Sequence, residues 1–72
     1  MAGNGNGSSP SRAQVALANS PFYELRHLRV DQRERTLLLS GTVSSFYHKQ
    51  LAQEVVRAVS DGCEVVNDVH VK

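Results

Sequence analysis

The stretch TLLLSGTV, residues 36–43, decides the fold. It contains no charged side chain, and Leu37, Leu39 and Val43 fall on one face when successive side chains alternate as in a β-strand. Leu38 and the small polar residues of the stretch fall on the other face. Because apolar side chains occur on both faces, we expect a strand at the centre of a sheet.

Two further strands flank this stretch. Upstream, residues 25–33 alternate, with Leu28 and Val30 pointing to one side and charged residues to the other. The polar connection at residues 32–35 is short enough for a hairpin. Downstream, residues 63–71 alternate in the same way. The pattern therefore predicts three strands.

Helices are predicted before the first strand and between the second and third. Ser11 and Gln14 have the spacing of a capping box ahead of a narrow apolar stripe that ends before Pro21. Ser44 or Ser45 begins the second helix. Its apolar side chains recur every three or four residues, as Tyr47, Leu51, Ala52, Val55, Val56 and Val59. Gly62 is predicted to end this helix in a left-handed conformation.

These elements predict one α+β domain with the order αββαβ. Two helices pack on one face of a three-stranded mixed sheet, and the third strand runs parallel to the second because such crossovers are right-handed. The face that the helices cover carries Leu28, Val30, Leu37, Leu39, Val43, Val65, Val69 and Val71. The other face stays open. Residues 1–10, rich in glycine and asparagine, are expected to be a disordered leader to a domain at residues 11–72.

Composition limits the classes of function. The chain has 72 residues and a formal net charge of +1, which argues against a nucleic-acid partner. Cys63 is the sole cysteine, so an intrachain disulfide and a cysteine-based zinc site are excluded. No set of residues indicates catalysis, a metal site or a cofactor, and we expect a non-enzyme. Without a signal peptide, the chain as written is expected in the cytoplasm, or in the periplasm if it is a fragment of a larger exported protein.

The sequence LLLSGTVSS at residues 37–45, together with VVNDVHV at residues 65–71, resembles the core of BON domains, small modules of bacterial osmotic-stress, outer-membrane and secretion-associated proteins. The resemblance covers residues 13–72. It departs from the family pattern at Cys63, where a valine is usual, and in a hairpin turn without the usual glycine. It implies a non-catalytic αββαβ module that contacts phospholipid surfaces in several members and proteins or small ligands in others. Monovalent cations are also bound among relatives, but no residue pattern here indicates such a site.

Two groups of side chains are candidates for binding. The first is a basic stretch that either contacts anionic lipid or is a solvated edge strand: Arg26, His27, Arg29, Arg33 and Arg35. The second is Leu38 with Val66, an apolar pair near His70 on the open face, which suits a protein partner or a weak homodimer. The leading hypothesis is a module that contacts anionic phospholipid or a protein partner. The alternative is a protein-interaction or homo-oligomerisation domain without lipid affinity.

Other singled-out residues have structural roles in the prediction. Gly41 marks a bulge or a close helix approach, and the amide of Asn67 ties an edge or a turn. The aromatic residues Phe22, Phe46 and Tyr47 either pack on the core, which we expect, or reach a membrane interface. The histidines are expected to be ordinary surface residues, with His27 and His70 on opposite edge strands: His27, His48 and His70.

Overall fold

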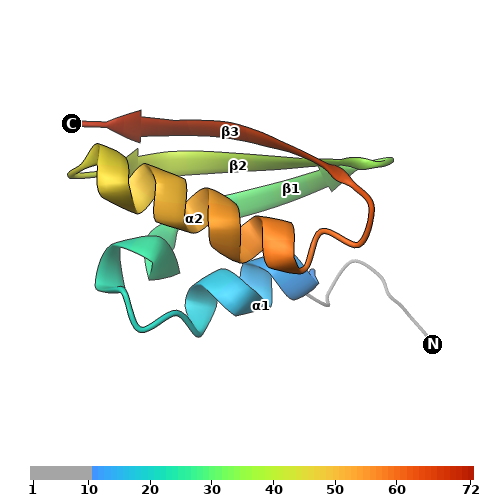
Figure 1. Ribbon diagram of the computed structural model, residues 1–72, viewed down its shortest axis with the longest axis horizontal. Helices are drawn as coiled ribbons and strands as arrows, with labels where there is room; N and C mark the ends of the chain where they lie inside the picture. The colour runs from blue at the N-terminus through green and yellow to red at the C-terminus, as the bar shows by residue number, and fades with distance from the viewer. Residues whose placement is uncertain (1–10) are drawn as a thin grey trace.

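The computed structural model describes residues 11–72; the predicted leader at residues 1–10 lies outside the described residues. It confirms the α+β class, with helices on one side of a three-stranded mixed sheet (Figure 1). The elements in chain order are α1 (Arg12–Ala18), the short 3₁₀-helix η2 (Tyr23–His27), β1 (Arg29–Arg33), β2 (Thr36–Val43), α2 (Phe46–Ala58) and β3 (Glu64–Val71).

The sheet has the predicted order β1-β2-β3, with β2 at its centre. β1 pairs with β2 in antiparallel orientation, and Val30 lies opposite Leu39. β3 pairs with β2 in parallel orientation, and Leu38 lies opposite Val66. β2 spans the residues predicted for it, because its alternation and its lack of charge are both strong signals.

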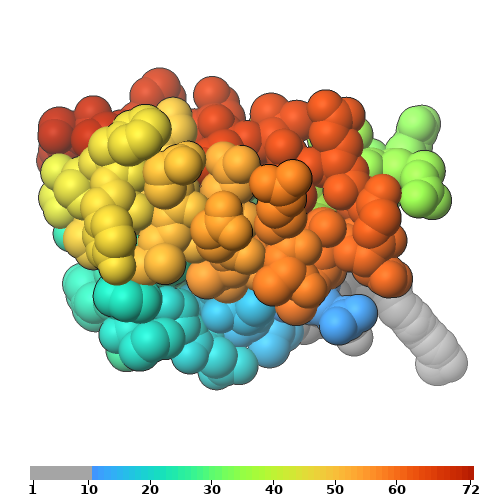
Figure 2. Space-filling model, viewed as in Figure 1, coloured from blue at the N-terminus to red at the C-terminus, as the bar shows by residue number. Residues whose placement is uncertain are grey.

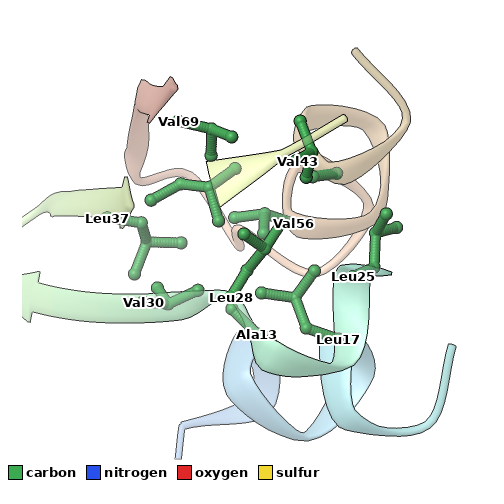
Figure 3. Packing of buried hydrophobic residues seen from close by; sticks show 11 residues of the cluster. Ala13, Leu17, Leu25, Leu28, Val30, Leu37, Val43, Val56 and Val69 are labelled. Carbon is green, nitrogen blue, oxygen red and sulfur yellow. The ribbon is translucent and has the colours of Figure 1, made fainter. Parts of the chain in front are cut away.

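The core is aliphatic and lies between the sheet and the helices (Figure 3). Its buried members are Ala13, Leu17, Leu25, Leu28, Val30, Leu37, Leu39, Val43, Ala52, Val56 and Val69. Val71 was predicted on this covered face, yet 42% of its surface is exposed. Val71 is the last residue of β3, which is an edge strand, so it has few neighbours to cover it.

The first helix is tied to the sheet by one side chain. The Ser11 hydroxyl accepts a hydrogen bond from the Gln14 backbone N–H at 3.1 Å, as predicted for an N-cap. The Gln14 side chain does not complete the capping box. Its amide nitrogen donates to the Leu28 carbonyl and its oxygen accepts from the Val30 N–H, both at 2.9 Å. Gln14 thus covers backbone groups at the start of β1.

The predicted first strand was too long at its beginning. Residues 25–27 belong to η2 instead, and Leu25 is completely buried in the core rather than placed in the sheet. The η2 segment packs beside α1 below the sheet (Figure 1). A five-residue 3₁₀-helix is too short to show a period of its own. The alternating pattern of β1 therefore predicts a strand over residues 25–27 as well.

The prediction for Gly62 was right in backbone conformation but wrong in place. α2 ends at Ala58 with Val59 as its C-cap. Gly62, at φ 88°, follows Asp61, at φ 54°, in a separate turn closed by a 3.0 Å hydrogen bond from the Cys63 N–H to the Ser60 carbonyl. Two successive positive φ angles match a type I′ turn, in which glycine suits the second position.

Candidate functional site

All four Phe and Tyr side chains of the protein are exposed. They belong to the starts of η2 and α2, which lie at the same end of the molecule (Figure 1). We call this surface the aromatic end; it consists of Phe22, Tyr23, Phe46 and Tyr47. Their exposed fractions are 37%, 68%, 64% and 62%. Core packing of Phe22, Phe46 and Tyr47 was therefore a wrong prediction: the aliphatic core closes without them.

Two chain segments form the aromatic end. Phe22 is the N-cap of η2 and Tyr23 its first residue, whereas Phe46 and Tyr47 are the first two residues of α2. Figure 2 shows the start of α2, in yellow, against the teal surface of η2. The rings of Phe22 and His48 join the two segments in an edge-to-face contact with centroids 6.3 Å apart.

Hydrogen bonds fix the backbone on which these rings stand. The Glu24 carboxylate accepts from the Ser44 N–H at 2.7 Å and from the Ser44 hydroxyl at 2.5 Å, which links η2 to the turn before α2. These two bonds, the hydroxyl one first, lower the pKa of Glu24 below its ordinary value of 4.5. Ser45 caps α2 by accepting from the His48 N–H at 3.2 Å. The aromatic end is thus built on two capped or pinned helix starts.

The five predicted basic residues do not form one surface. Arg26 and His27 belong to η2: Arg26 Nε donates to the Ser20 carbonyl at 2.8 Å, and the His27 ring contacts Tyr23 with centroids 4.8 Å apart. Arg29 and Arg33 are exposed on the open face of β1. Arg35 lies at the hairpin turn and donates to the Gly62 carbonyl at 3.4 Å. Only the first two lie beside the aromatic end.

The open sheet face brings Leu38 and Val66 together. They are paired residues of neighbouring strands, and each has 38% of its surface exposed. His70, also exposed, lies further along β3. The exposed charged residues of the same face belong to both signs: Arg29, Asp31, Arg33, Glu64 and Asp68. Leu38 and Val66 therefore form a small apolar centre within a rim of mixed charge.

Gly41 and Asn67 contact structural elements of the domain. Gly41 has φ 131°, and a Cβ atom on it would lie 2.6 Å from Leu28 Cδ2. The β2–β3 register runs through it without an inserted residue, so it is a close approach and not a bulge. The Asn67 amide nitrogen donates to the Lys49 carbonyl and Gln53 Oε1, and its oxygen accepts from the Val69 N–H. Asn67 thereby ties β3 to α2.

The histidines are dispersed over the part of the chain that the structure describes. His27 lies in η2, so the prediction that His27 and His70 occupy opposite edge strands was wrong for His27. Among residues 11–72 no group of three or more His, Cys, Asp or Glu side chains is placed to hold a metal ion. A shallow pocket of about 180 Å³ lies beside Cys63, Asp61 and Val59. It lies among α1, the β1–β2 hairpin and the turn after α2, and not at the aromatic end.

Sequence reasoning missed Tyr23 and misjudged its three aromatic neighbours. The available signal was their position: none lies inside a predicted strand, and Phe46 and Tyr47 directly follow the predicted cap of the second helix. Since the first turn of a helix at the end of a layered domain has no neighbouring layer beyond it, aromatic residues there remain exposed. The composition of the strands is a second signal. Their apolar residues are all aliphatic, which indicates that the core does not need the aromatic side chains.

The family model described as the BON domain matches residues 7–72 of the chain. A comparison with curated proteins found no match. None of the helices in the described region is long and apolar enough to span a membrane. The match covers both helices and all three strands, and its description agrees with the resemblance carried by residues 37–45 and 65–71.

Proposed function

This chain belongs to the BON domain family of non-catalytic binding modules, and we propose that it binds anionic phospholipid surfaces through its aromatic end. The observation that supports this most is the placement of the aromatic residues. The core contains none of them, whereas Phe22, Tyr23, Phe46 and Tyr47 are exposed at the starts of η2 and α2, two segments in contact with each other.

Phe and Tyr suit the boundary between lipid and water. Aromatic residues, Trp and Tyr above all, are enriched at membrane interfaces, where an apolar ring meets acyl chains and a polar tip stays hydrated. Burying such a ring fully contributes on the order of 1.5 to 3 kcal/mol, so partial burial of four rings supports measurable binding without a membrane-spanning segment. The pinned backbone of η2 and α2 lowers the entropy lost on docking.

The charge beside the rings favours anionic lipid. Arg26 is exposed, and its side chain is held by the Ser20 carbonyl next to Phe22. Glu24, in the same segment, stays ionised and partly offsets this charge, but its carboxylate accepts two hydrogen bonds from Ser44. A basic residue near an anionic membrane surface contributes about 1 kcal/mol. The open sheet face is less suitable, since Arg29 and Arg33 stand there among three acidic residues, so Arg29, Arg33 and Arg35 are not part of the proposed contact.

Co-sedimentation with vesicles tests this proposal. The wild type is compared with a variant carrying Phe46→Ser and Tyr47→Ser, using vesicles of phosphatidylcholine alone or mixed with phosphatidylglycerol. We expect the wild type to bind the mixed vesicles more strongly and the variant to bind about tenfold or more weakly, equivalent to ~1.4 kcal/mol.

The matched control removes the same number of exposed apolar side chains from the open face, by Leu38→Ser with Val66→Ser. This control should bind vesicles like the wild type, with an unchanged circular dichroism spectrum. If the control loses binding while the aromatic variant keeps it, the lipid contact lies on the sheet and the proposal is wrong.

A further inference from the structure

The charges of the open sheet face are arranged by strand. On β1 the exposed side chains alternate in sign, as Arg29, Asp31 and Arg33. On β3 the charged side chains before His70 are acidic, Glu64 and Asp68. The pairing register aligns them in rows across β2: Arg33, Thr36 and Glu64 form one row, and Arg29, Ser40 and Asp68 form another.

The middle row is the apolar one. Asp31 lies opposite Leu38, and Leu38 lies opposite Val66. Within one row the β1 and β3 residues are two strand spacings apart, roughly 9.6 Å. The arginines of β1 are therefore too far from the carboxylates of β3 in the same copy to pair with them directly. The open face is net positive along β1 and negative along β3.

We infer that the open sheet face binds the same face of a second copy, related by a two-fold axis parallel to the strands. Such an axis reverses the strand order, so β2 faces β2 and β1 faces β3 of the second copy, while each row stays level with itself. Arg29 then faces Asp68 of the second copy, and Arg33 faces its Glu64. Symmetry makes four ion pairs around a Leu38–Leu38 contact.

Other face-to-face arrangements lack this complementarity. A two-fold axis across the strands would place β1 on β1 and bring Arg29 against Arg33 of the second copy, which is repulsive. The axis along the strands leaves one unfavourable kind of contact, Asp31 over Val66, which symmetry makes twice. Packed sheets cross at about −30°, which displaces the outer strands by roughly 3 Å, a distance that an arginine side chain spans. The self-complementarity favours a second copy over an unrelated partner.

The contact is small. Three strands are roughly 14 Å wide and eight residues are about 26 Å long, so the footprint is on the order of 350 Å² per copy. A stable interface usually buries about 800 Å² per partner. We therefore expect a weak dimer that forms at high protein concentration. It does not involve the aromatic end, which stays free in both copies.

Sedimentation velocity over a concentration series to the millimolar range, without lipid, tests the inference. We expect a wild-type dimer. Arg29→Glu and Asp68→Arg should each weaken association at least tenfold, because each replaces two symmetric attractions by repulsions. The double variant carrying both changes should associate like the wild type, since its pairs are restored with opposite polarity.

A wild type that stays monomeric at every concentration overturns the inference. So does a pair of single variants that associate like the wild type, or a double variant that fails to recover.

Glu54→Arg, on the exposed side of α2, serves as a control for a general effect of charge reversal and should leave association unchanged. Asp31→Leu removes both unfavourable Asp31–Val66 contacts and should strengthen the dimer. Circular dichroism checks that all variants are folded.

Discussion

The aliphatic core and the aromatic end divide the apolar residues of this protein by type. Eleven buried hydrophobic residues form the core, and all are Ala, Leu or Val. The aromatic end contains every Phe and Tyr of the chain, each more than one third exposed. Stability and surface contact thus depend on different side chains. Substitutions in the two regions should therefore have separable effects.

Leu39→Ala should have the largest effect, because Leu39 is completely buried on the central strand. The cavity should lower the free energy of unfolding by about 3 kcal/mol, a large fraction of the stability of a domain this small. Urea denaturation measures it. Leu38→Ala, one residue away on the open face, should cost less than about 1 kcal/mol. Equal losses in the two variants would contradict the burial pattern.

Gly41→Ala should have the next largest effect on stability. It tests how tightly Gly41 packs against the buried Leu28 side chain. The new methyl group would meet Leu28 Cδ2 at 2.6 Å, and the backbone has φ 131°. We expect a loss of about 2 kcal/mol by urea denaturation. Gly62→Ala is the matched comparison, since its methyl group would approach only the end of the Arg35 side chain at 3.2 Å. A larger loss at Gly62 would reverse this ranking.

Glu24→Gln should weaken the link between the aromatic end and the rest of the fold. The pKa of Glu24 is lowered in the folded protein, so the ionised carboxylate stabilises the fold above the unfolded-chain value near 4.5, and this stability is lost as the pH falls through the lower folded value. The Gln variant should have a Tm a few degrees lower at pH 7, and the difference should vanish in acid. A constant difference at all pH values would show that the charge is irrelevant.

Phe46→Ser with Tyr47→Ser should have the smallest effect on stability. Both rings are more than 60% exposed, so the free energy of unfolding should change by less than about 0.5 kcal/mol. The same variant is the one expected to lose vesicle binding. A stability loss as large as that of Leu39→Ala would mean that the rings support the core, and the division between the two regions would fail.

Local patterns predicted most of the fold. The bounds of β2 followed from alternation, which depends on near neighbours. Helix periodicity limited the cap of α2 to Ser44 or Ser45, and the structure has Ser45. The η2 segment did not, because Leu25 is buried by contacts with distant elements and not by a period of its own. The Gln14 amide was also missed as a contact with β1, since a capping box and an edge contact look alike in sequence.

The candidate site was less predictable than the fold. Tyr47 follows the apolar spacing of α2, and only the end of the helical layer leaves it exposed. The residues around Leu38 were placed well, because the strand period fixes which face each side chain occupies. The grouping of the arginines was not predicted correctly, because Arg26 lies in η2 and not in the first strand.

The contact of Gln14 with β1 also determines how the N-terminal part of the domain opens. α1 has seven residues, which is too short for a stable isolated helix, so it folds only when docked. The Val30 N–H has the Gln14 side chain as its acceptor, and exchanges with solvent when that side chain departs. Its hydrogen-exchange rate therefore reports how often α1 detaches, whereas buried amides of β2 report unfolding of the whole sheet.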